Sequence, residues 1–141
     1  MIGPDRGLFG GGTSGDVIER HKKYANAAGE LDVIVFAPPP YRDVRISTNL
    51  RVFSSRSSKL THWRGAVRRA EELIEDQPYD LLVCQELAAP SGARIRQKFG
   101  IPLIIGIHSM FYSNSWLGTR PERWYLYWRI RRALSAADAF G

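Results

Sequence analysis

The chain of 141 residues contains three histidines, and one of them stands where catalytic or binding residues are often found. His108 follows the apolar run Leu103–Ile107, which has the length and the β-branched residues of a buried strand. A residue at the end of such a strand emerges at the edge of a sheet, where ligands of α/β proteins bind. The imidazole can there form hydrogen bonds with a substrate or a reacting group. The alternative is a histidine bonded to a backbone carbonyl, with a structural role only.

A carboxylate ends a second apolar run of the same kind. Glu86 comes shortly after Leu81–Cys84, at the start of a predicted helix. It can bind hydroxyl groups of a ligand or orient His108. A carboxylate stabilised by the dipole at the N-terminus of a helix explains the residue equally well.

Six residues near the start, Gly10–Gly15, match the pattern G-x-G-x-x-G and precede a helical pattern. Their backbone amides favour a phosphate site. The dinucleotide-binding interpretation fails two checks, because Pro4–Phe9 separate the loop from the first strand and the next strand ends in Phe36-Ala37-Pro38, without a ribose-binding acid. No lysine follows as a P-loop requires. Three interpretations of this segment remain: a loop that binds an anion or a sugar phosphate, a loop without a binding role, or a hinge at Gly11 and Gly12.

Short apolar runs predict the strands that position these residues. Three of them lack polar alternation, as central strands of a parallel sheet do, and cover Val33–Ala37, Leu81–Cys84 and Pro102–Ile107. Met1-Ile2 is expected to be the end of an earlier strand, and Arg51–Ser54 a short further one.

Helical patterns alternate with these strands. They cover Asp16–Ala28, Leu60–Asp76, Ala88–Phe99 and a last segment from Thr119 to Ala137, which is predicted to begin with a capping box of Thr119 and Glu122. The alternation predicts an α/β fold, a Rossmann-like, doubly wound and mostly parallel sheet with helices on both faces. Ligands of such sheets bind at the carboxyl ends of the strands.

Length and composition predict one domain. A chain with 44% hydrophobic residues can bury a core of domain size, and no run of about 18 apolar residues indicates a membrane span. The start lacks the basic and apolar regions of a secretory signal, and the single cysteine, Cys84, is expected to be a buried, inert thiol. These features indicate a cytoplasmic protein.

No metal site is expected, because the histidines are scattered and no carboxylates have ligand spacing. His62 is expected to lie in solvent or to pack beside Trp63.

The formal charge of +6 is consistent with binding to nucleic acid, to an anionic membrane or to phosphorylated ligands, and also with a solvated basic surface that has no partner. Residues 120–132 are the most one-sided segment, with five arginines against Glu122. An amphipathic basic helix with Trp and Tyr can lie on an anionic bilayer, although aromatic residues at helical spacing more often belong to the core. Nucleic-acid binding would need an exposed platform of arginines and aromatics and is not expected. The aromatic residues concerned are Trp116, Trp124, Tyr125, Tyr127 and Trp128.

Taken in order, several short motifs resemble the N-terminal domain of family 4 glycosyltransferases. No one of them is specific, and their order and spacing across nearly the whole chain carry the resemblance. The motifs are Gly11-Gly12 before Glu19-Arg20-His21, Asp32–Phe36, Tyr79–Glu86, Phe99–Ile105, Ile107-His108-Ser109 and Ala136–Ala139.

The resemblance implies one half of a two-domain GT-B enzyme, truncated at both ends. This acceptor-side half would shape the acceptor site, and an absent C-terminal half would bind the nucleotide-sugar, without a metal or another cofactor. His108 would lie beside the transferred sugar, Gly11 and Gly12 would contact donor phosphate or acceptor, and Glu86 and Ser109 would contact substrate. Many relatives have Asp in place of Glu86 and Thr-Asp in place of Ser109-Met110, which leaves the acceptor open.

The implied activity is that of a hexosyltransferase in glycan biosynthesis, which transfers a sugar from a nucleotide-sugar to a glycan, a lipid-linked acceptor or a small molecule. The enzyme would be cytoplasmic, with peripheral contact at the inner face of the membrane as an option, and this part alone would be inactive. The alternative is a stand-alone Rossmann-like domain that binds an anion, a dinucleotide or a partner without catalysis. A second Rossmann-like half encoded downstream would distinguish the two.

Overall fold

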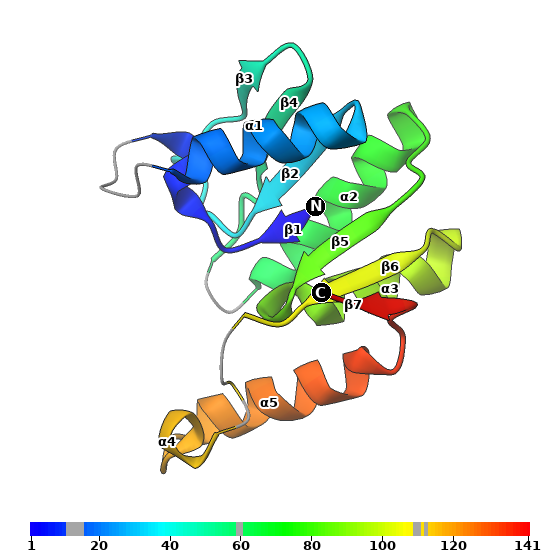
Figure 1. Cartoon of the computed structure of the whole chain (residues 1–141). Helices are drawn as coiled ribbons and strands as arrows, with labels where there is room; N and C mark the ends of the chain where they lie inside the picture. Colours follow the sequence, from blue (N-terminus) through cyan, green and yellow to red (C-terminus); the bar gives the residue numbers. More distant parts are fainter. Residues whose placement is uncertain (11–15, 59–60, 109–110, 112) are drawn as a thin grey trace.

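The computed structural model describes residues 1–10, 16–58, 61–108, 111 and 113–141. Within these residues the chain forms one seven-stranded sheet in the order β3-β4-β2-β1-β5-β6-β7 (Figure 1). The strands are β1 (Ile2–Gly3), β2 (Leu31–Val35), β3 (Val44–Ser47), β4 (Leu50–Ser54), β5 (Leu82–Gln85), β6 (Leu103–Gly106) and β7 (Ala139–Phe140).

All neighbouring strands except one pair are parallel. β1 pairs in parallel with β2 and β5, β2 with β4, β5 with β6, and β6 with β7. The three predicted central strands are therefore confirmed as members of one parallel sheet. The exception is the antiparallel pair of β3 and β4. The apolar pattern does not predict β3, because this edge strand is partly exposed and has no continuous apolar run.

Helices cover both faces of the sheet, as the sequence predicts (Figure 1). Successive side chains of β2 point to opposite faces, so Val33 and Val35 share a core cluster with α1 (Val17–Ala28), and Ile34 belongs to the other cluster. That second cluster includes residues of α2 (His62–Asp76) and α3 (Ala89–Phe99). Three shorter helices, η1 (Arg6–Phe9), η2 (Glu86–Ala88) and α4 (Asn114–Leu117), lie in the connections.

The last helix, α5 (Pro121–Leu134), starts later than predicted and has no capping box. Its N-cap is Arg120, whose backbone is extended (φ −87°, ψ 112°) and whose side chain forms no capping hydrogen bond. The reason is Pro121, because a residue before proline is driven away from the helical conformation. Thr119 therefore lies outside the helix, and Glu122 is one position too early for the box. Across the described ranges, no helix is long and apolar enough to cross a membrane.

At the amino edge of the sheet, the buried carboxylate of Asp32 joins three parts of the chain. Arg51 donates to it from Nε at 2.8 Å and from Nη2 at 2.6 Å, and the Tyr79 hydroxyl donates to it as well. Burial, followed by this hydrogen bond, raises the pKa of Tyr79 above its ordinary value. Asp32 is thus a structural residue at the opposite end of the strands from the expected site.

Candidate active site at the carboxyl edge

The order of the strands reverses at β1, which lies between β2 and β5. The connections that leave the carboxyl ends of β1 and β5 run to opposite sides there, and ligands of open α/β sheets bind at such a point. In this chain the connections begin with η1 after β1 and η2 after β5, and His108 follows β6. These three segments make up the candidate site.

Two glycines make room for polar side chains at this edge. Gly3, Gln85 and Gly106 lie in one row across β1, β5 and β6. A Cβ atom on Gly3 would lie 2.9 Å from Cδ of Gln85, and one on Gly106 would lie 2.9 Å from Nε2 of His108. The Cys84 side chain faces α3, where its Sγ would be 2.6 Å from a Cβ on Gly92. Gln85 and the His108 ring therefore lie on the opposite face, the face that α1 covers.

Glu86 is brought to His108 by the pairing of β5 with β6. Its carboxylate accepts a hydrogen bond from the backbone N–H of His108, with 3.1 Å between Oε2 and the nitrogen. Glu86 is only 8% exposed, whereas His108 is exposed to solvent. The carboxylate holds the backbone of the histidine and leaves its ring available at the surface.

A second polar group, which sequence reasoning missed, lies beside this pair. Nε2 of Gln85 donates to Oδ2 of Asp5 at 3.4 Å, and Nη2 of Arg20 lies 3.6 Å from the same oxygen. The only sequence signal was the position of Asp5 and Gln85 near the carboxyl ends of two strands. The group presents an amide, a carboxylate and a guanidinium, which can bind hydroxyl groups or an anion.

Three predicted site residues, Gly11, Gly12 and Ser109, lie outside the described residues. The described neighbours of the glycine-rich loop are Gly10, which ends η1 with a φ of +81°, and Asp16, which precedes α1. A positive φ of this size favours glycine. The loop therefore connects η1, whose N-cap is Asp5, with α1, which carries Arg20 in its first turn.

The other two histidines are buried structural residues. Nδ1 of His21 donates to the carbonyl of Val17 at 2.8 Å. The expectation of a solvated His62 is wrong, because its ring is buried and stacks on Phe36 with centroids 5.5 Å apart. The alternative, that His62 packs beside Trp63, stays a prediction. Gly65 of the same helix lets α2 approach the segment that follows β4, because a Cβ there would lie 2.5 Å from the Ser55 carbonyl oxygen. Among the described residues, no three His, Cys, Asp or Glu side chains are grouped to hold a metal ion.

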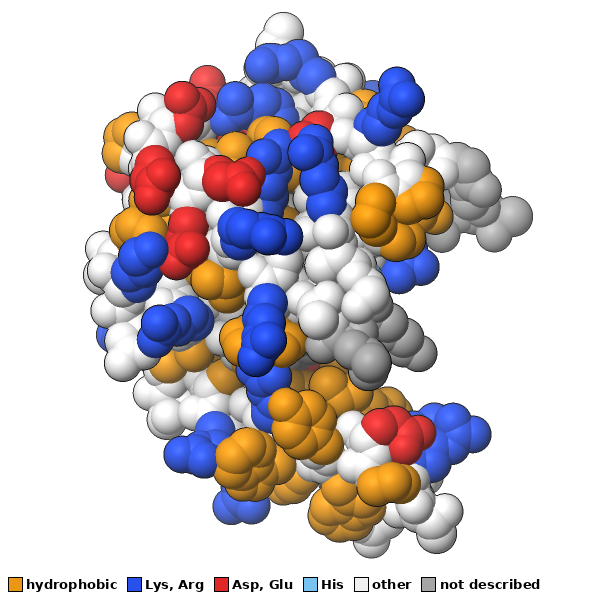
Figure 2. Space-filling view, turned by 180° about the vertical axis from the view of Figure 1, so that it is seen from behind, with side chains coloured by type: hydrophobic (Ala, Val, Ile, Leu, Met, Phe, Trp, Pro, Cys, Tyr) orange, Lys and Arg blue, Asp and Glu red, His pale blue; other side chains and the backbone are white. Residues whose placement is uncertain are grey.

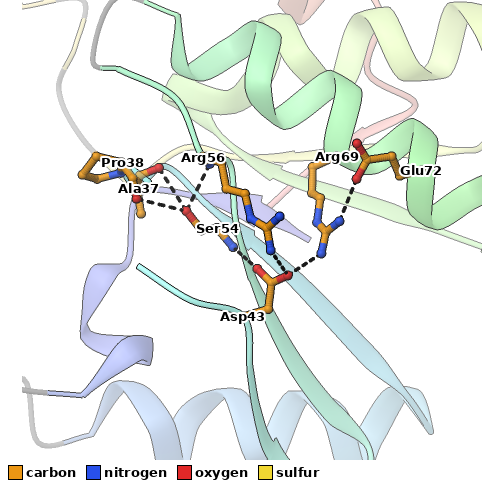
Figure 3. A network of polar contacts seen from close by, with 7 residues as sticks. All are labelled: Ala37, Pro38, Asp43, Ser54, Arg56, Arg69 and Glu72. Atoms are coloured by element: carbon orange, nitrogen blue, oxygen red, sulfur yellow. Dashed lines mark hydrogen bonds and ion pairs between the residues drawn. The ribbon is translucent and has the colours of Figure 1, made fainter. Parts of the chain in front are cut away.

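Farther along the carboxyl edge, Asp43 organises a network of paired charges (Figure 3). Its carboxylate accepts hydrogen bonds from the Ser54 N–H at 3.0 Å, from Arg56 at 2.8 Å and from Arg69. Arg69 also donates to Glu72 at 2.6 Å. The network ties the β3–β4 region to α2 and gives this end of the edge a fixed shape.

The sheet and its carboxyl-edge site define a Rossmann-like α/β domain. The model of the glycosyl transferase 4-like domain matches residues 17–140, and the chain belongs to this family. The matched range contains Glu86, His108 and Ser109, and it begins after Gly11 and Gly12. Among curated proteins, no match to the chain was found.

Proposed function

We propose that this domain is the acceptor-side half of a GT-B enzyme that transfers a sugar from a nucleotide-sugar to an acceptor hydroxyl. Membership of the family supports a glycosyltransferase in general. The observation that supports the proposed site is the hydrogen bond between Glu86 and the backbone of His108, beside the switch point of the sheet. The proposal includes a cytoplasmic location and requires no metal or other cofactor.

In the proposed reaction, the acceptor hydroxyl oxygen forms a bond to the anomeric carbon of the sugar, and the bond from that carbon to the nucleoside diphosphate breaks. The hydroxyl proton passes to the departing diphosphate or to water. His108 would hydrogen-bond the sugar or the reacting groups, with Glu86 as the residue that positions it. Asp5, Gln85 and Arg20 would bind acceptor hydroxyls or a negatively charged group of the acceptor. Gly11, Gly12 and Ser109 would contact donor phosphate or acceptor.

A second half is part of the proposal because both substrates must be held at once. The diphosphate would be bound and stabilised as it departs by cationic groups of that half, and closure would align the substrates and exclude water. We therefore expect the 141-residue chain by itself to be inactive.

The experiment measures nucleotide release from a panel of nucleotide-sugars in the presence of candidate acceptors. It compares this chain, a longer protein that joins the domain to a nucleotide-sugar-binding half, and the longer protein with His108→Ala. We expect turnover only in the longer protein, and a loss on the order of 10²-fold in the variant. Turnover by the chain alone would contradict the need for two halves. Unimpaired turnover by a folded His108→Ala variant would leave this histidine a structural role only.

The alternative of a dinucleotide-binding module has less support. Such a module uses an acid at the carboxyl end of the second strand for the ribose. Here β2 is followed by Phe36 and Ala37, and the nearby acid, Asp32, is bound to Arg51 and Tyr79 at the other edge.

A further inference from the structure

The outer face of α5 carries three large aromatic side chains in contact with solvent. Trp124, Tyr125 and Trp128 are 50%, 56% and 53% exposed. Their spacing of one and four residues places them on one side of the helix. Figure 2 shows large apolar side chains beside basic side chains over α5. Aromatic side chains of this size are usually more buried, so this face is a candidate contact surface.

The orientation of α5 is set by its other side. Ile130 and Ala133 are buried in the main core cluster, and Tyr127 packs partly against it. The expectation that the aromatic residues of this segment belong to the core is therefore correct for Tyr127 and wrong for the exposed three. This inner stripe attaches the helix to α3.

Arginines lie over two of these exposed rings and over Trp63 of α2. The guanidinium of Arg129 is 4.1 Å from the ring centroid of Trp63 and 5.7 Å from that of Tyr125, and Arg132 is 4.6 Å from Trp128. Arg64 lies 5.1 Å from the Trp63 ring. These cation–π contacts join the start of α2 to α5. We call this the aromatic–arginine surface; its residues are Trp63, Arg64, Trp124, Tyr125, Trp128, Arg129 and Arg132.

The surface has an excess of positive charge that is not neutralised locally. Within the described residues, Arg64, Arg129 and Arg132 form no ion pair. Glu122 is the single acid in α5. A partner that binds this surface should therefore be negatively charged. It should also offer an environment that favours the half-exposed Trp and Tyr side chains.

We propose that the aromatic–arginine surface binds an anionic lipid bilayer, with α5 lying in the plane of the membrane. Trp and Tyr are enriched at the level of the lipid headgroups, where their rings meet the acyl boundary and cationic side chains meet lipid phosphates. Nucleic acid fits less well, since bases would have to stack on exposed rings of which two, Tyr125 and Trp128, already have a face covered by Arg129 and Arg132. The inference does not depend on the proposed sugar transfer.

The test is co-sedimentation of the chain with vesicles of phosphatidylcholine alone and with vesicles that also contain phosphatidylglycerol. We expect binding to the anionic vesicles, weakened by added salt because the arginines contribute through charge. The combined variant Trp124→Ala, Tyr125→Ala, Trp128→Ala should lose on the order of tenfold in partitioning. Its matched control is Tyr24→Ala, which removes another exposed aromatic side chain, on α1. Arg132→Gln should weaken binding more than Lys23→Gln, a loss of the same charge on α1.

Circular dichroism verifies that each variant is folded. A second measurement uses the unchanged chain, because quenching of tryptophan fluorescence by brominated lipid reports whether these rings enter the bilayer. Equal binding to both vesicle types, equal losses in the Tyr24→Ala and combined variants, or an absence of quenching would overturn the proposal. Binding of a single-stranded oligonucleotide without binding of vesicles would assign the surface to nucleic acid instead.

Discussion

The carboxylate of Glu86 accepts a hydrogen bond from the backbone N–H of His108, 22 residues further along the chain. The contact forms because β5 and β6 are neighbours and the two residues follow their carboxyl ends. It fixes the first polar residue after β6 through the main chain, so the position of the histidine does not depend on its own ring contacts.

Removal of this carboxylate should loosen His108. In Glu86→Ala we expect the His108 amide to exchange with solvent deuterium about tenfold faster or more, since a hydrogen bond to a charged group contributes about 1.5–3 kcal/mol. Glu86→Gln keeps an acceptor oxygen and should restore much of the protection. The comparison variant is Glu75→Ala, an exposed acid in α2. Unchanged exchange in Glu86→Ala would show that other contacts hold this backbone.

Gly92 is required by the packing of α3 on β5. A Cβ at this position would lie 2.6 Å from Sγ of Cys84 and 2.8 Å from Cδ1 of Leu103. Gly92→Ala should lower the free energy of unfolding by about 1–3 kcal/mol, as overpacked core sites do. Urea denaturation measures the change, and Gln97→Ala on the exposed side of α3 is the control. If the urea midpoint of Gly92→Ala is as high as that of the unchanged chain, β5 and α3 can move apart at little cost in free energy.

The thiol of Cys84 should be inert in the folded chain. Burial raises the pKa of Cys84 to about 12, from an ordinary value of 9.0. At pH 8 a disulfide reagent should therefore react only on unfolding, which absorbance of the released thiol can follow with and without urea. Because the folded pKa is raised, the thiol's contribution to stability is complete below pH 9 and declines as the pH rises toward 12. Rapid labelling of the native chain would contradict this burial.

Asp138 should make the free energy of unfolding depend on pH in the acidic range. Two hydrogen bonds from Arg96, at 2.7 and 2.6 Å, and one from the Leu103 N–H, at 2.8 Å, lower the pKa of Asp138 below its ordinary 3.8. A lowered pKa gives a contribution to stability that is complete above the ordinary value and is lost as the pH falls below it. Asp138→Asn should therefore be less stable at pH 6, by a difference that shrinks below pH 4. Denaturation at several pH values measures this, with the exposed Asp76→Asn as control.

Local patterns were sufficient for the framework of the domain. The apolar runs that became β2, β5 and β6 are continuous because both faces of these strands are covered, and such runs are visible without any partner. The helices followed from their spacing, and the order of motifs indicated the family that the matched domain model established. The start of α5 was misjudged, because the effect of Pro121 on Arg120 outweighed the Thr119–Glu122 pattern.

The sequence by itself determined the central strands and the main helical segments, the family and the edge of the sheet at which His108 and Glu86 emerge. Only the tertiary structure decided that Glu86 binds the backbone of His108, that Gln85 meets Asp5, and that Trp124 and Trp128 face solvent. The physical reason is the distance along the chain that separates the residues concerned. Strand and helix patterns depend on residues close in the chain, whereas these contacts join residues brought together by strand order, and exposure depends on which side of a helix its neighbours leave uncovered.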